Sequence, residues 1–220
     1  MWFTNLASPA VGRTSVTGTT TEFSFAGGTA GFHLIVGPDN NIWFTEFSSN
    51  LVLRVSTSGS MVSQYTVTSA LELAAGSDGN VWVTGANKVW RIAIASGIVT
   101  GFSVGASPNG LVSGPDGNLW IMESGANKIG KFVVSSTTLS AEFTIPSPGT
   151  FARFITNGPD GNLWFTESDA NKIGRITTAG TITEFTPPTQ NSGPQAIVAA
   201  PDGNLYFIEQ NVNQIGRVTP

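Results

Sequence analysis

Cysteine is absent from this chain of 220 residues, and charged residues are scarce. Without a thiol, the chain cannot form disulfides, thiolate metal sites or a cysteine nucleophile. Asp, Glu, Lys and Arg make up 11% of the residues, against about a quarter in an average protein. The ten basic residues are scattered singly, and the formal net charge is −4. Nucleic acid and membrane surfaces are therefore not expected as partners.

Long apolar runs are also missing. No stretch approaches the ~18 consecutive apolar residues of a membrane span, and the N-terminal MWFTNLASPAVGRTS has no basic segment followed by an apolar run. We therefore expect a soluble chain whose export signal is absent or removed, and no compartment is indicated. Gly is abundant, with 26 residues, as are Ser, Thr, Phe and Trp. This balance is typical of a turn-rich β protein.

An aromatic residue recurs at intervals of 38 to 44 residues, in WFTE-like segments, at Trp2, Trp43, Trp82, Trp120, Trp164 and Tyr206. A period near 40 with β content throughout predicts propeller blades. In each unit a first apolar run ends in a turn such as GPDGN (114–118), an alternating second strand follows (118–123), and a turn beginning at 127 leads to a third strand (129–132). TITEF (181–185) illustrates the fourth strand.

These patterns predict an all-β fold, a β-propeller of four-stranded antiparallel blades forming one domain over residues 1–220. The blade units cover approximately residues 1–25, 31–66, 70–103, 107–144, 151–186 and 193–219. Six second and six third strands are predicted, but only five first and five fourth strands. Two arrangements therefore fit: six blades of which two are incomplete, or a fragment of a larger, seven-bladed ring.

The unit GPDGNLWFTE (158–167), followed by NKIGRI (171–176) and TITEF, resembles the repeat of the virginiamycin B lyase (streptogramin lyase) family. The resemblance covers essentially the whole chain and is strongest from Ser107 to Thr219. It implies a seven-bladed propeller that opens a cyclic depsipeptide antibiotic by elimination at an ester linkage, without water. That chemistry uses a base at an α-proton and a Lewis acid, magnesium in this family, at the ester carbonyl.

The family base is a His in a Pro-His-Gly-Ile segment that opens a first strand, and a Glu closes the second strand fourteen residues later, the spacing of Arg153 and Glu167 here. Both side chains are expected near the channel rim, because those two strand ends meet. The positions that match the His carry other residues, namely Phe32, Leu71, Asn109, Arg153 and Gln195. The single histidine, His33, lies one position later, where a strand turns its side chain to the other face. The resemblance makes His33, Glu167 and Arg153 the catalytic candidates.

Four carboxylates match the family Glu, namely Glu46, Glu123, Glu167 and Glu209. One interpretation is a ring at the channel mouth that holds a hard cation such as Mg²⁺. The other is that each caps its hairpin or pairs with a nearby Lys or Arg as part of the blade template.

The positions that vary between blades are the other candidates. Asn109, Arg153, Gln195 and Phe32 would contact a ligand at the channel rim, with Arg153 binding a carboxylate or neutralising Glu167. Trp90 stands where other blades have Gly in the third strand. It is expected either to cover the gap left by a shortened neighbouring turn or to offer its ring to a ligand.

Three functions follow from these observations. The first is a lyase-like propeller that keeps the scaffold and carboxylates but lacks the family His in this chain. The second is a non-catalytic propeller that binds a small molecule, peptide or protein at the channel mouth or through Trp90. The third is a blade array whose open terminal blades pair with another copy, so that the chain is a monomer or an oligomer.

Overall fold

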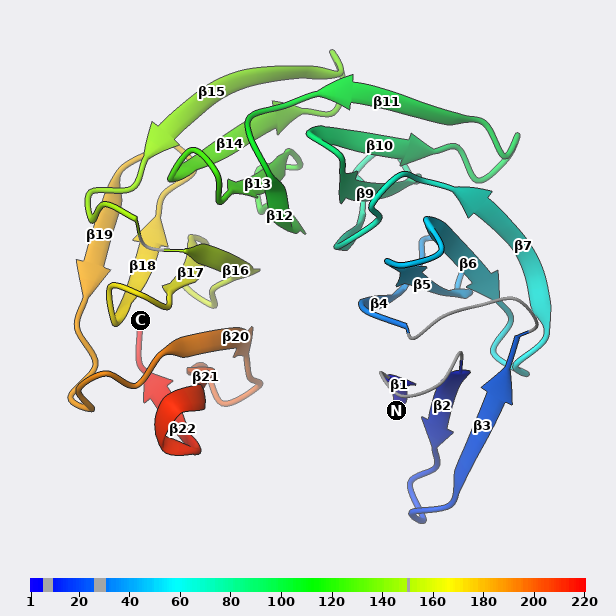
Figure 1. Ribbon diagram of the computed structural model, residues 1–220, viewed down its shortest axis with the longest axis horizontal. Helices are drawn as coiled ribbons and strands as arrows, with labels where there is room; N and C mark the ends of the chain where they lie inside the picture. Colours follow the sequence, from blue (N-terminus) through cyan, green and yellow to red (C-terminus); the bar gives the residue numbers. More distant parts are fainter. Residues whose placement is uncertain (6–9, 26–30, 150) are drawn as a thin grey trace. The chain divides into compact units, whose positions relative to one another are not determined.

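The computed structural model describes residues 1–5, 10–25, 31–149 and 151–220. These residues form six antiparallel sheets of three or four consecutive strands, the blades of a β-propeller (Figure 1). The predicted all-β fold class is therefore confirmed. Part of the first predicted blade unit, residues 6–9, lies outside the described residues.

The chain divides into two compact units, Met1–Ser103 and Val104–Pro220, of three blades each. In the first unit, the blades comprise β1 (Trp2–Asn5), β2 (Ala10–Thr14) and β3 (Thr20–Ser24); β4 (Leu34–Val36), β5 (Ile42–Glu46), β6 (Leu51–Val55) and β7 (Met61–Thr66); and β8 (Leu73–Ala75), β9 (Val81–Gly85), β10 (Lys88–Ile92) and β11 (Val99–Ser103).

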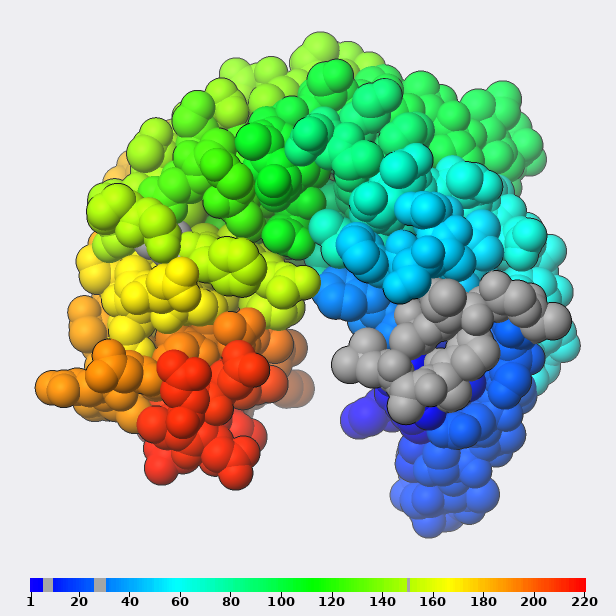
Figure 2. Space-filling view, in the orientation of Figure 1, coloured from blue at the N-terminus to red at the C-terminus, as the bar shows by residue number. Residues whose placement is uncertain are grey.

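The second unit has the same organisation. Its blades comprise β12 (Pro108–Ser113), β13 (Leu119–Glu123), β14 (Lys128–Val133) and β15 (Thr138–Thr144); β16 (Ala152–Asn157), β17 (Leu163–Glu167), β18 (Lys172–Ile176) and β19 (Ile182–Phe185); and β20 (Pro194–Ala199), β21 (Leu205–Glu209) and β22 (Gln214–Val218). In Figure 2 the atoms of these three blades, green to red, form one continuous body. The one helix among the described residues is the 3₁₀ turn Gln210–Val212, so no helix there could cross a membrane.

The turn between the first two strands of a blade is built by its own sequence. In GPDGN (114–118), Gly117 has φ +74°, the left-handed conformation that glycine adopts without strain. Asp116 accepts hydrogen bonds from the Asn118 amide and from Trp120 Nε1, at 3.2 and 3.1 Å. Although burial alone would raise it, these bonds and the Lys131 ammonium lower the pKa of Asp116 to about 2. The turn therefore fixes the Trp that begins the second strand.

The cores lie between consecutive blades of a unit. Trp120 and Ile129 of the fourth blade pack with Leu163, Phe165 and Ile176 of the fifth. The fifth blade in turn packs its opposite face against the sixth, through Trp164, Ile173, Ile197, Leu205 and Phe207. Each inner blade thus buries both faces, and this explains why every residue of its second strand is buried, as in β17.

Candidate functional site

The first strands of the second unit all carry the same irregularity near their start. Their register with the second strand shifts between Pro108 and Leu111, between Ala152 and Ile155, and between Pro194 and Ile197. Such β-bulges bend a strand and redirect a side chain, and they are common beside binding sites. The bulged segments begin with Asn109, Arg153 and Gln195, the positions that the sequence singled out as variable.

The bulges lie at the ends of the strands that carry the glutamates. Pro108 is opposite Glu123, Ala152 is opposite Glu167 and Pro194 is opposite Glu209. The predicted meeting of the first-strand start with the second-strand end is therefore confirmed for these blades. Neighbouring first strands also approach closely, because a Cβ added to Gly110 would lie 2.2 Å from the Arg153 carbonyl oxygen.

The side chains of the three bulge residues are half-buried, and each contacts a neighbouring side chain. Asn109 Nδ2 donates to Ser124 Oγ at 3.4 Å, and Gln195 Nε2 donates to Ser168 Oγ at 3.1 Å. The Arg153 guanidinium lies 5.8 Å from the centroid of the Phe154 ring, a cation–π geometry. The three positions thus present an amide, a guanidinium and a second amide at equivalent ends of consecutive strands.

Phe151 is a residue of this site that the sequence analysis missed. It has φ +45° and its side chain is 49% exposed. The equivalent residues of the neighbouring blades, Ser107 and Gly193, are also left-handed, with φ +52° and +59°. The signal in the sequence is therefore a bulky aromatic at a position that elsewhere holds Ser or Gly, two residues before Arg153. A left-handed conformation costs a non-glycine residue about 1–2 kcal/mol, so the backbone alone does not favour Phe here.

His33 lies in the first unit, and both of its ring nitrogens are engaged. Nδ1 accepts a hydrogen bond from the Leu73 amide at 3.1 Å, and Nε2 lies 3.0 Å from Glu72 Oε2. This arrangement places the proton on Nε2, and it leaves Nδ1 as the acceptor of a backbone donor. To remove a substrate proton, the ring would have to break one of these two contacts. Its geometry is that of a histidine that ties the second blade to the third.

The four candidate glutamates are buried. Glu46, Glu123 and Glu167 are 0% exposed and Glu209 is 3% exposed. Ser49 donates to Glu46, and the Gly105 amide donates to Glu123 at 3.1 Å. The interpretation of these glutamates as a ring at the channel mouth stays a prediction.

Two of these glutamates face a second carboxyl group from the fourth strand of the same blade. Burial, followed by the nearby Glu184 carboxylate, raises the pKa of Glu167 to about 8. Burial and Glu142 likewise raise the pKa of Glu123 to about 7. For Glu184, by contrast, burial acts to raise the pKa, but hydrogen bonds from Lys172 and Ser147 outweigh it and lower the pKa. The positive charge of Lys172 partly offsets the rise in the pKa of Glu167.

The four candidate glutamates do not form a metal site by themselves. Within the described ranges, no three His, Asp or Glu side chains converge as a metal site requires. A hard cation also needs ionised ligands, whereas burial raises the pKa of Glu167 to about 8 and that of Glu123 to about 7. The magnesium expectation stays a prediction.

The remaining candidates, Phe32 and Trp90, belong to the first unit. Phe32 is half-buried, and its amide donates to the Thr45 carbonyl at 2.8 Å. Trp90 Nε1 donates to the Gly85 carbonyl at 3.0 Å, and its ring lies against Gly101 and beside the core of the second and third blades. Trp90 thus contacts the short turn after β9, and its role toward a ligand stays a prediction.

Comparisons with known proteins agree with this architecture. The family model described as the virginiamycin B lyase family matches residues 1–103 and 62–220. A catalytically inactive His-to-Ala variant of virginiamycin B lyase from Staphylococcus aureus, solved with quinupristin, is 34% identical with a TM-score of 0.93, over 99% of this chain and 76% of that one. A streptogramin B lyase structure is 29% identical with a TM-score of 0.88, over 100% of this chain and 78% of the other.

A protein of unknown function from Desulfotomaculum acetoxidans shares the fold, with 16% identity and a TM-score of 0.77 over 99% of this chain and 78% of its own. Comparison with curated protein sequences finds no match. The family model spans the whole chain, and it agrees with the six blades and their repeated turns. The chain belongs to the virginiamycin B lyase family.

Proposed function

We propose that this chain binds a cyclic depsipeptide of the type B streptogramin class at the bulges in the first strands of the second unit. The observation that carries the proposal is the series of three bulges, which presents Asn109, Arg153 and Gln195 at equivalent strand ends. A polar residue that changes from blade to blade on an otherwise regular scaffold suits an irregular ligand, since each bulge then meets a different part of it.

The chemistry of the bulges suits a peptide with ester and aromatic groups. Amide side chains donate to carbonyl oxygens, and Arg153 donates to carbonyl or carboxylate oxygens from a planar fork. Phe151, two residues before Arg153, adds an exposed ring, and an exposed aromatic ring packs against apolar or aromatic side chains of a ligand. Amide donors, a cation and an aromatic ring are the small set of directed groups that a ligand site needs.

Binding is best tested by calorimetry with quinupristin, the ligand named for the related lyase. We expect Arg153→Ala to weaken binding about tenfold or more, because a hydrogen bond to a charged group contributes about 1.5–3 kcal/mol. Arg217→Ala is the matched control, since Arg217 is an exposed arginine on β22, the third strand of the sixth blade. Absence of binding by the unaltered chain, or equal losses in both variants, would contradict the proposal.

Lyase activity is the second candidate, and family membership with 34% identity to a virginiamycin B lyase favours it. The elimination removes the α-proton, breaks the C–O bond of the ester and yields a linear product of unchanged mass, whereas hydrolysis would add one water. Against this candidate, the matching positions hold no His, and both nitrogens of His33 are occupied.

Chromatography with tandem mass spectrometry distinguishes the two candidates. If the chain only binds, the intact cyclic compound is recovered after incubation with and without magnesium. A linear isomer that forms in proportion to protein concentration would instead establish lyase activity, and His33→Ala would then show whether that histidine takes part.

A further inference from the structure

A serine directly follows the second strand of the fourth and of the fifth blade, namely Ser124 after β13 and Ser168 after β17. Each hydroxyl donates a hydrogen bond to a carbonyl of the next blade. Ser124 Oγ lies 2.6 Å from the Ala152 oxygen, and Ser168 Oγ lies 2.6 Å from the Pro194 oxygen. Ala152 and Pro194 begin the first strands β16 and β20, so a hydroxyl of the preceding blade holds each of these strands at its start.

The second blade makes its link to the third in a different way. Thr45, within the second strand, donates to the Leu71 carbonyl at 2.7 Å. Met122 holds the place of Thr45 in the fourth blade and has no hydroxyl. Thr166 holds it in the fifth, and its buried Oγ1 has no hydrogen-bond partner among the described residues. In these two blades the serines therefore replace the threonine link, and they bind one position earlier in the next strand.

The carbonyl that Ser124 binds belongs to the residue directly before Arg153. A peptide group is planar, so a fixed Ala152 oxygen also fixes the plane that contains the nitrogen and Cα of Arg153. Arg153 lies in the bulge, between the ladder pairs made by Ala152 and by Ile155, where pairing does not set the direction of a side chain. Ser124 thus restrains the backbone from which the Arg153 side chain extends.

Ser168 holds the backbone before Gln195 in the same way, and it also binds the Gln195 side chain. A serine hydroxyl has one proton and a carbonyl oxygen only accepts, so the Ser168 proton is committed to Pro194. Ser168 Oγ then accepts from Gln195, and the amide atom at 3.1 Å is accordingly Nε2. The other end of this amide, Oε1, makes no hydrogen bond within the described part of the chain. Ser168 thus determines which end of the Gln195 amide is an open acceptor.

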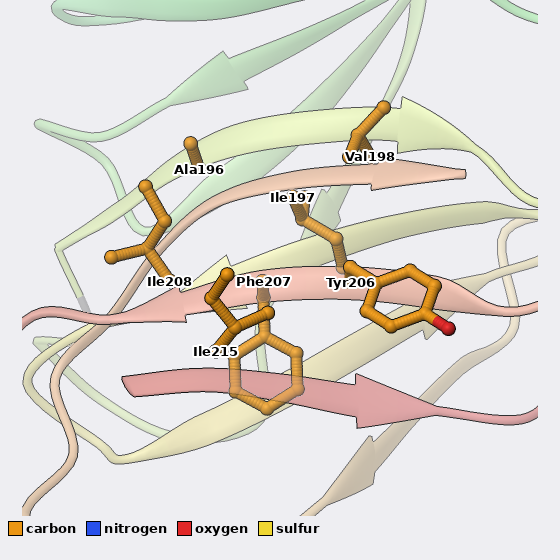
Figure 3. Close-up of a pocket in the computed structure, with 7 residues that line it drawn as sticks. All are labelled: Ala196, Ile197, Val198, Tyr206, Phe207, Ile208 and Ile215. Atoms are coloured by element: carbon orange, nitrogen blue, oxygen red, sulfur yellow. The ribbon is translucent and has the colours of Figure 1, made fainter. Parts of the chain in front are cut away.

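The strand beyond the bulge does not depend on this contact. The register of β20 with β21 is regular again from Ile197, which lies opposite Phe207. Figure 3 shows Ile197 and Val198 pointing to opposite sides of β20, as in an ordinary strand. Loss of the Ser168 contact should therefore change Gln195 and leave the rest of the blade in place.

We propose that Ser124 and Ser168 are positioning residues of the depsipeptide site. Ser124 directs the Arg153 guanidinium, and Ser168 turns the Gln195 amide so that Oε1 accepts an N–H group of the ligand. A depsipeptide retains amide N–H groups beside its ester linkages, and these are the donors that such an acceptor needs. These roles rest on the proposed function, and they assign Gln195 to a donor group of the ligand.

Calorimetry with quinupristin tests the Ser168 contact. We expect Ser168→Ala to weaken binding about three- to tenfold, the effect of one neutral hydrogen bond. Ser168→Thr should restore most of the affinity, because it keeps the hydroxyl. Ser140→Ala is the matched control, since Ser140 also donates to a backbone carbonyl, that of Lys131 at 3.0 Å, but on the fourth strand β15. Thermal unfolding of each variant separates a loss of folding from a loss of affinity.

Double variants distinguish positioning from a merely structural role. Ser168→Ala should cause no further loss of affinity in a Gln195→Ala background, because the side chain that the serine positions is gone. Ser124→Ala should likewise cause none in an Arg153→Ala background. Additive losses, or single serine variants that bind as tightly as wild type while Arg153→Ala does not, would overturn the positioning role and leave the proposed function standing. If the unaltered chain binds no quinupristin, the proposed function itself fails, and the positioning role fails with it.

Discussion

His33 Nε2 lies 3.0 Å from Glu72 Oε2, and the two residues occupy equivalent positions in consecutive blades. The His33 ring also accepts the Leu73 amide through Nδ1. The His33 side chain, directly before β4, thus contacts both Glu72, directly before β8, and Leu73, the first residue of β8. In this chain the position beside the family's catalytic His carries a structural link between blades.

We predict that His33→Ala lowers the free energy of unfolding by about 2 kcal/mol, because it leaves a backbone donor and a nearly buried carboxylate without their partner. Depsipeptide binding should not change. Urea unfolding measures the first effect and calorimetry the second, with the exposed Gln64→Ala as the control. A variant of wild-type stability that no longer binds would contradict the structural role.

Glu167 should make the protein less stable as the pH rises. Its pKa is about 8 in the folded chain against an ordinary value of 4.5, so the folded state binds the extra proton between these values. Stability from this group is full below about pH 4.5 and is lost as the pH rises through about 8. Glu123 acts in the same direction, with a pKa of about 7. Glu184 has a lowered pKa, and its contribution is lost only as the pH falls below its ordinary range.

Glu167→Gln should therefore flatten the dependence and leave the variant more stable than wild type at about pH 9, by an amount on the order of a few kcal/mol. Urea unfolding at several pH values between about 5 and 9 measures this slope. Asp169→Asn, on the surface, controls for the change of charge. If Glu167→Gln and wild type lose stability in parallel over this range, the prediction that Glu167 is protonated in the folded state is wrong.

Two glycines of one turn should respond differently to alanine. A Cβ at Gly158 would lie 2.3 Å from Trp164 Cδ1, whereas Gly161 has open space and φ +73°. Gly158→Ala must displace a buried ring and should cost about 2–3 kcal/mol, while Gly161→Ala should cost about 1 kcal/mol from its backbone alone. Thermal unfolding of both variants shows which is the less stable. A larger loss of stability in Gly161→Ala would show that the Trp164 indole is not fixed against Gly158.

Phe151→Gly should raise stability and weaken binding. Glycine relieves a left-handed φ of +45°, and this gain, reduced by the greater freedom of the unfolded chain, should be about 0.5–1 kcal/mol. Loss of the exposed ring should reduce depsipeptide affinity several-fold. Ser107→Gly relaxes the equivalent position of the fourth blade and controls for the backbone effect. Unchanged affinity in Phe151→Gly would remove this residue from the site.

The blades could be predicted because their signals are local. Asp116 and Trp120 belong to one turn and strand, and the Gly117 conformation is set within that turn. The period of the aromatic residues then places the strands of every blade. These features depend on residues a few positions apart, so the sequence contains them directly.

The environment of the candidate site could not be predicted in the same way. Alternation in a strand distinguishes two faces, but both faces of an inner blade are buried, so the pattern does not tell where the Glu167 carboxyl lies. Its pKa depends on Glu184, which reaches it from the fourth strand. The bulges arise from pairing between whole strands, and the contact of His33 with Leu73 crosses from one blade to another.

The bulges determine how freely the residues of the candidate site can be replaced. Arg153 lies between two points of fixed register, Ala152 opposite Glu167 and Ile155 opposite Phe165. A residue held outside the ladder can be replaced without moving the strand that follows. Each blade of the second unit thus carries one bulged position whose residue can be exchanged independently of the other two. If the bulges bind the ligand as proposed, a library limited to residues 109, 153 and 195 samples new ligand specificities at little risk to folding.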